Sequence, residues 1–208
     1  MAVVVTQSAK VGQSTVAISL SGVGATSTLV IFYGTASGNQ ITSISDNAST
    51  HYSWSNLEYM NSTGARTTEM WAGIGGSGGS VTATLNTTPN NNTFLVIVEL
   101  TNAVVDIAGQ HYVGGVSPSV GPSLTPAGAG ELLLAFCNST VDSQSPPAGW
   151  THLQDDGGVY YSAYSLAGTS GTPASPSFGT TAGMIVAAVF SPPPPSASGN
   201  FFGFLGGG

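Results

Sequence analysis

The residues that could carry out nucleophilic or metal-assisted chemistry are few and scattered along the chain. Residues 75–79 (GGSGG) match the G-x-S-x-G pattern of a serine nucleophile. That pattern positions a nucleophile only between a strand and a helix, and here we expect strands on both sides. The three histidines, His51, His111 and His152, are far apart in sequence and have no metal-ligand spacing. The sequence therefore predicts a flexible turn at Ser77 and no metal site.

Carboxylates offer equally little for acid–base catalysis. Glycoside hydrolysis needs two carboxylates a few ångströms apart across a cleft. The chain holds nine acidic residues, of which Glu69 and Glu99 fall on expected strands and Glu58 falls near one. With no convincing pair among them, we expect no catalytic residues and no cofactor, and we interpret the protein as a non-enzyme. A hydrolase on a jelly-roll scaffold is a remote alternative.

Aromatic residues give the one positive hint of a binding function. A stacking platform for sugars could be formed by Trp54, Trp71, Trp150, Tyr160, Tyr161 and Tyr164. Large residues are also needed on the inner faces of strands, so filling of the core is the favoured interpretation. We therefore predict that Trp54, Trp71 and Trp150 are core anchors. Exposure of Trp71 and Trp150 to solvent would instead favour a sugar platform.

The charge of the chain excludes some partners. Charged residues make up only 5% of 208 residues, the net charge is −7, and Lys10 and Arg66 are the only basic side chains. Two cations cannot neutralise a row of phosphates, which excludes nucleic acid, and the same scarcity argues against an anionic membrane surface. A surface with so few ions suits a molecule packed among neutral neighbours or facing the exterior.

Cysteine usage and the N-terminus bear on location. Cys137 is the single cysteine, so no intrachain disulfide can form, and its place at the end of an apolar run predicts a buried hydrophobe. The first ten residues, MAVVVTQSAK, have neither a basic region nor a long apolar region, so no signal peptide is expected. Either the protein assembles inside a cell into a particle that is later released, or a signal has been removed. Met1 favours the first route.

Two parts of the chain show the same order of features. Residues 130–168 contain an apolar run at 132–137, a Pro-Gly corner that leads to Trp150, an Asp-Gly hairpin signal and a tyrosine-rich strand. In the first half, the run at 29–33, then Trp54, then residues 67–74 follow the same order. The apolar runs FLVIVEL and MIVAAVF, at 94–100 and 184–190, close the two halves. We interpret this as an internal duplication, although stretches of any β-sandwich share alternation and glycine turns.

The fold class follows from these strands. No stretch has a helical period, and glycine and proline recur too often for long helices, so we predict an all-β fold. The predicted architecture is a two-sheet β-sandwich or jelly roll of about ten strands, built from two pseudo-repeated halves. We expect a polar turn at residues 10–14 and a further short strand at about 111–113. We expect one domain over residues 1–190, with repeats at about 27–100 and 130–190. Two small sandwiches in tandem are the alternative, but the short connection at 101–129 favours one fused body.

The C-terminal segment, residues 191–208, differs from the rest of the chain. Its sequence, SPPPPSASGNFFGFLGGG, begins with four prolines that predict an extended spacer. The spacer is followed by the apolar residues predicted to dock on a neighbouring subunit, namely Phe201, Phe202, Phe204 and Leu205. A disordered terminus is the alternative.

Three features resemble a known group of proteins. They are Asp46-Asn47 leading to a tryptophan, the sequence PAGWT at 147–151, and a closing aromatic strand. This combination resembles β-sandwich proteins of bacteriophage particles and of bacterial surfaces, over about residues 27–192. The resemblance implies a component of a particle or surface and supplies no catalytic residues.

These observations lead to two expectations for function. The first is a non-enzymatic virion structural protein at the virion surface, present in many copies as a capsid, decoration or fibre component. Its expected partners are copies of itself and other particle proteins, with surface glycans as a further candidate and with neither nucleic acid nor membrane. The alternative is a carbohydrate-binding or adhesive module of the extracellular space or cell surface.

Overall fold

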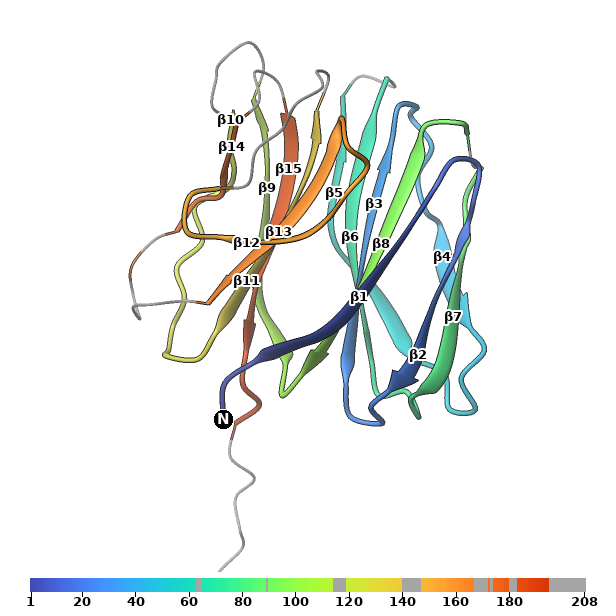
Figure 1. The fold of residues 1–208 in the computed structure, drawn as a ribbon, viewed down its shortest axis with the longest axis vertical. Helices are drawn as coiled ribbons and strands as arrows, with labels where there is room; N and C mark the ends of the chain where they lie inside the picture. The colour runs from blue at the N-terminus through green and yellow to red at the C-terminus, as the bar shows by residue number, and fades with distance from the viewer. Residues whose placement is uncertain are drawn as a thin grey trace, which may run out of the picture.

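The computed structural model describes residues 1–62, 65–88, 90–113, 119–139, 147–166, 172, 174–179 and 183–194. Within these ranges the chain forms fifteen β-strands and no helix (Figure 1). The predicted all-β sandwich class is therefore confirmed, with more strands than the ten or so expected. The described residues accordingly contain no helix that is long and apolar enough to cross a membrane.

Eight strands lie in the first half of the chain and seven in the second. The first half contains β1 (Val4–Gly12), β2 (Ala17–Val23), β3 (Thr28–Thr35), β4 (Ser43–Asp46), β5 (Ser53–Asn61), β6 (Thr67–Ile74), β7 (Gly79–Asn86) and β8 (Thr93–Thr101). The second half contains β9 (Val104–Val113), β10 (Ser119–Val120), β11 (Leu132–Ser139), β12 (Thr151–Asp155), β13 (Tyr160–Leu166), β14 (Ser177–Phe178) and β15 (Gly183–Ser191).

Two five-stranded antiparallel sheets with the same strand order form the centre of the molecule. The first inner sheet has the order β1-β8-β3-β6-β5, and the second inner sheet, read in the same direction, has the order β9-β15-β11-β13-β12. Each strand of one sheet therefore has a counterpart in the other, at the same place in the sheet and in the same order along the chain. The two halves thus share the strand order that an internal duplication predicts, and the shared unit also includes β1 and β9, which lie before the repeat bounds expected from the sequence.

The pairing register extends this correspondence to single residues. Trp54 in β5 pairs opposite Gly73 of β6. Trp150 directly precedes Thr151, which pairs with Tyr164 of β13. Both tryptophans therefore stand at the start of the edge strand of their sheet. The neighbouring strands, β6 and β13, are the two whose sequences were matched between the halves.

The two inner sheets pack face to face around the central core. Phe32 of β3 and Phe136 of β11 meet at its middle, with ring centroids 5.3 Å apart and planes inclined by 16°. Around them lie buried aliphatic residues from both sheets, including Val96 and Val186. At the margins β5 contacts β9 and β1 contacts β12, which are equivalent pairs with the halves exchanged. The halves are thus related by an approximate two-fold axis, as subunits of a symmetric dimer would be.

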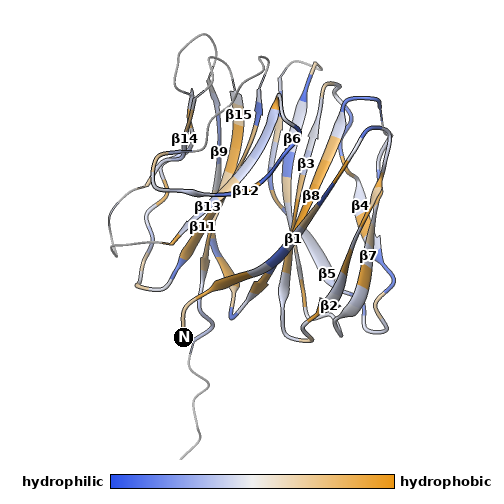
Figure 2. Ribbon diagram, in the orientation of Figure 1, coloured by the Kyte–Doolittle hydropathy of each residue, from blue (hydrophilic) through white to orange (hydrophobic). Residues whose placement is uncertain are grey.

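Smaller sheets cover the outer faces of the inner sheets (Figure 1). The first outer sheet, β2-β7-β4, buries Ile31 and Leu95 against its own Val81. The second outer sheet, β10-β14, contributes Phe178, which packs against Ile185 of β15. Strands β3, β8, β11 and β15 are consequently buried on both faces, and Figure 2 shows hydrophobic residues concentrated on β8 and β15. The predicted sandwich is therefore flanked by a further layer on each side.

Two strand boundaries differ from the sequence-based expectation. A turn was expected at residues 10–14, yet β1 continues to Gly12 because alternate side chains of this edge strand face solvent, including Lys10. A short strand was expected at 111–113, yet β9 is a ten-residue strand that pairs along β15. In both cases polar residues on the exposed side of an edge strand resembled a turn or a loop.

The two ends of the described chain lie at the same end of the molecule. The backbone N–H of Val3 donates to the carbonyl oxygen of Gly130 at 2.9 Å, and Ser191 Oγ donates to Glu131 Oε1 at 2.9 Å. Pro192 follows directly at the end of β15. Residues 195–208, with the predicted docking residues at 201, 202, 204 and 205, lie outside the described residues.

Candidate functional site: a polar cleft between the two halves

A cleft of about 700 Å³ opens at the end of the molecule opposite to Val3 and Ser191. It lies between the end of β1, the loop before β8, and the hairpin that joins β12 to β13. Its lining includes Lys10, Arg66, Asn91, Asn92, Asp156 and Tyr160. The cleft therefore combines residues from both halves, and it contains both basic side chains of the protein.

Both cations reach from the first half to the second. Lys10 Nζ donates a hydrogen bond to the backbone carbonyl oxygen of Asp155. Arg66 Nη1 donates to Asn138 Oδ1 at 2.9 Å and also to the carbonyl oxygen of Ser139. All three acceptors are uncharged oxygens, and the ion pairs formed within the described ranges involve only histidines. The positive charges of the cleft are thus held in place without a carboxylate partner among the described residues.

An aromatic stack closes the floor of the cleft. The ring of Tyr160 lies parallel to that of Phe94, with centroids 5.3 Å apart, and also stacks on Phe136. A Cβ atom on Gly34 would lie 2.6 Å from the Tyr160 ring, so only glycine fits beneath it. Burial raises the pKa of the Tyr160 phenol, which stays protonated and donates to the carbonyl oxygen of Asn92. Tyr160 therefore supports the loop that carries the cleft amides.

The rim of the cleft adopts an unusual backbone conformation. Gln13 and Ser14 have φ angles of 52° and 55°, in the left-handed region that residues other than glycine rarely adopt. Their backbone N–H groups donate to the carbonyl oxygens of Thr93 at 2.8 Å and Asn90 at 2.9 Å. Ser14 Oγ donates to Asn91 Oδ1 at 2.8 Å. These bonds hold the turn between β1 and β2 against the loop before β8, so the rim is fixed in place.

The acidic residue of the cleft has a structural role in its hairpin. Asp156 Oδ1 accepts hydrogen bonds from the N–H groups of Gly158 and Tyr160, both at 2.9 Å. Asp155 Oδ1 accepts from Gly157 N at 2.8 Å, and its Oδ2 lies 2.8 Å from His152 Nε2. This confirms the hairpin expected from the Asp-Gly sequence.

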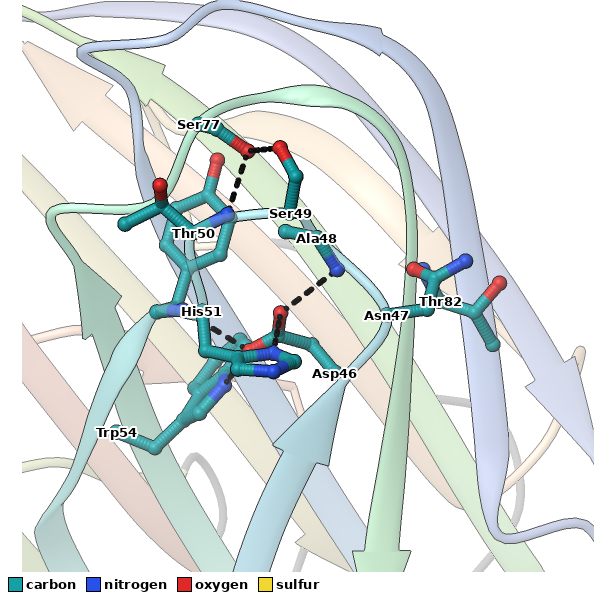
Figure 3. A network of polar contacts seen from close by, with 10 residues as sticks. Asp46, Asn47, Ala48, Ser49, Thr50, His51, Trp54, Ser77 and Thr82 are labelled. Atoms are coloured by element: carbon teal, nitrogen blue, oxygen red, sulfur yellow. Dashed lines mark hydrogen bonds and ion pairs between the residues drawn. The ribbon is translucent and has the colours of Figure 1, made fainter.

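A second polar cluster surrounds Asp46, at the end of β4 (Figure 3). Asp46 Oδ1 accepts from Ala48 N at 3.0 Å and lies 3.2 Å from His51 Nδ1. Its Oδ2 accepts from Tyr52 N at 3.0 Å and from Trp54 Nε1 at 2.9 Å. Burial alone would raise the pKa of Asp46, but these hydrogen bonds outweigh it and lower the pKa below the usual value. Because four groups occupy the carboxylate, we interpret it as the clamp that shapes this loop.

Two of the three glutamates considered for acid–base chemistry, Glu69 and Glu99, are buried in separate loop clamps, whereas Glu58 is half-buried on β5. Glu69 accepts from Ile41 N at 2.8 Å, Asn56 Nδ2 at 3.1 Å and Trp71 Nε1 at 2.7 Å, and burial raises its pKa to about 7. Glu99 accepts hydrogen bonds of 2.6 to 2.7 Å from Gln7, Gly24 and Ser27. Both side chains are closed off from solvent, so neither could reach a substrate.

The predicted core anchors occupy different depths. Trp71 is only 8% exposed, and Trp54 is half-buried, with its ring lying over Gly73. Trp150 is half-buried against the core between the second inner and outer sheets. The burial of Trp71 removes it from any sugar platform.

The other candidate residues lie in structural positions. Ser77 lies in the turn between β6 and β7, where its hydroxyl contacts Ser49 Oγ at 2.9 Å and accepts from Thr50 N at 3.1 Å (Figure 3). His111 on β9 is exposed, and its Nδ1 lies 2.7 Å from the carbonyl oxygen of Val120. No group of three or more potential metal ligands occurs within the described ranges.

Sequence reasoning did not predict the cleft. It identified Lys10 and Arg66 as scarce cations, and that scarcity was the available signal, but their meeting depends on the packing of the two halves. Comparisons with protein-family models, with curated proteins and with solved structures found no match to this chain.

Proposed function

We propose that this protein is a non-enzymatic structural component of a virus particle, exposed at the virion surface as a capsid, decoration or fibre protein. It would assemble in many copies through its C-terminal segment. The observation that carries the proposal is that the two ends of the molecule differ. The N-terminal strand and the start of the proline run lie at one end, while the cleft lies at the other.

This arrangement suits a subunit that is attached at one end. A run of prolines favours an extended spacer after Ser191, and the apolar sequence beyond it would supply residues for docking on a neighbour. The opposite end is then left to face outward. Four stacked sheets, with the central strands of the two inner sheets buried on both faces, supply the rigid body that such a subunit needs.

The alternative is a carbohydrate-binding or adhesive cell-surface module. The observation that favours it is the polar cleft with its two cations. The burial of Trp71 disfavours the version in which exposed tryptophans stack on sugars.

Light scattering tests the proposal by giving the mass in solution. The full-length chain should form oligomers of defined size, and a chain that ends at Ser191 should be monomeric. A full-length variant with Phe201, Phe202 and Phe204 replaced by serine should also be monomeric, because apolar side chains rather than length provide the contact. Monomers of the unaltered full-length chain, or oligomers that persist after truncation, would overturn the proposal.

A further inference from the structure

We propose that the cleft is a binding site for an acidic sugar, whose carboxylate lies against Lys10 and Arg66. This inference is independent of assembly through the C-terminal segment. It rests on the distribution of charge, on the finding that no described carboxylate pairs with either cation, and on the polar groups that surround the two cations.

The cleft is the positively charged part of an acidic protein. Its lining holds Lys10, Arg66 and one carboxylate, Asp156, so its formal charge is +1. Since the whole chain carries −7, the remaining residues carry −8. Both basic side chains of the protein thus lie at this end, so an anion is attracted here more than elsewhere on the surface.

The two cations remain available to a ligand. Eight of the nine acidic residues lie in the described ranges, and none of these eight forms an ion pair with Lys10 or Arg66. Arg66 Nη1 donates to two uncharged oxygens, Asn138 Oδ1 and the carbonyl oxygen of Ser139, and the side chain lines the cleft. A guanidinium binds carboxylates through two parallel N–H donors, and the bond is charge-assisted. A bound carboxylate would pair with two cations that form no ion pair with any described acidic residue.

The neutral groups of the cleft suit hydroxyls. Gln13, Asn91 and Asn92 are exposed there, and amide side chains can both donate and accept hydrogen bonds. Asn91 Oδ1 accepts from Ser14, which orients the amide before a ligand arrives. A volume of about 700 Å³ lies within the range of about 300 to 1,000 Å³ typical of small-molecule sites. One or two sugar rings that carry a carboxylate would place the carboxylate against the two cations and the hydroxyls against the amide side chains.

The experiment compares matched sugars binding to the full-length protein by calorimetry. The probes are galacturonic acid and N-acetylneuraminic acid, and galactose is the neutral match because it differs from galacturonic acid only at carbon 6. Acetate tests the carboxylate alone. We expect at least one sugar acid to bind, more tightly than galactose and acetate by about tenfold or more, and more weakly as salt is added.

Substitution of the exposed cation tests the site. Lys10→Gln should weaken binding of the sugar acid about tenfold, and Lys10→Arg should retain most of it. Gln110→Glu is the matched control, because Gln110 occupies the position of Lys10 on the equivalent edge strand and the change lowers the net charge equally. Binding of neither sugar acid, equal binding of galactose or acetate, or equal loss in Lys10→Gln and Gln110→Glu would overturn the proposal.

Discussion

Buried carboxylates in this protein are stabilised by neutral donors. The side chains of Asp46, Glu69, Glu99 and Glu131 are almost completely buried, and each accepts hydrogen bonds from backbone N–H groups and from uncharged side chains. With only two basic residues in the chain, ion pairs could not compensate four buried acids. Burial raises the pKa of Glu69, whereas hydrogen bonds lower the pKa of Asp46. These two residues therefore predict opposite effects of pH on stability.

Glu69 should make the protein less stable as pH rises. Its pKa is about 7 in the folded protein and 4.5 in an unfolded chain, so between these values the folded form keeps a proton that the unfolded form releases. The free energy of unfolding should therefore fall by about 3 kcal/mol across this window. Urea unfolding at a series of pH values would measure the difference between wild type and Glu69→Gln. A difference that does not depend on pH would contradict the prediction.

Asp46 should show the opposite dependence. Its pKa is lowered in the folded protein, so its contribution is present above the usual value of 3.8 and is lost as pH falls below it. Asp46→Asn places an amide donor against N–H donors and should cost about 2 to 3 kcal/mol at neutral pH. This cost should shrink in acid.

Urea unfolding would measure the effect of Asp46→Asn, with Asp106→Asn, on the exposed side of β9, as the control. Equal destabilisation by the two changes would show that the loop clamp is unimportant.

At the scale of the elements, the sequence was sufficient to identify the strands of the repeat but not their layers. Alternation and turn residues located β6 and the hairpin of β12 and β13, and the matched tryptophans aligned the halves. The four central strands read as continuous apolar runs, such as FLVIVEL in β8. Continuous runs are typical of strands buried on both faces, and they were the available signal for the outer sheets. The short strands β10 and β14 carry too few residues to show any period.

Close packing of the inner sheets makes Gly34 sensitive to a single methyl group. In Gly34→Ala the new Cβ would lie 2.6 Å from the Tyr160 ring, which is stacked in the core and cannot move freely. We expect the free energy of unfolding to fall by about 1 to 3 kcal/mol. Gly12→Ala is the control, because its Cβ would meet Phe94 at an ordinary 3.9 Å. Denaturant unfolding of both variants gives the measurement, and equal stability would contradict this account of the packing.

At the scale of the whole molecule, the cleft could not be predicted because it depends on how the halves are arranged. Lys10 and Arg66 lie 56 positions apart and both belong to the first half, whereas Asp156 and Tyr160 belong to the second. The approximate two-fold axis brings the end of β1 to the β12–β13 hairpin.

The shared core predicts that the two halves unfold together. The inner faces of both inner sheets form one buried cluster, so separation of the halves would expose the apolar residues of each to water. Calorimetry should show one transition, with equal calorimetric and van't Hoff enthalpies. Asp46→Asn, a change confined to the first half, should move this transition to lower temperature without splitting it. Two resolved transitions, with only one of them moved by Asp46→Asn, would instead establish two independently stable sandwiches, each able to keep its own core.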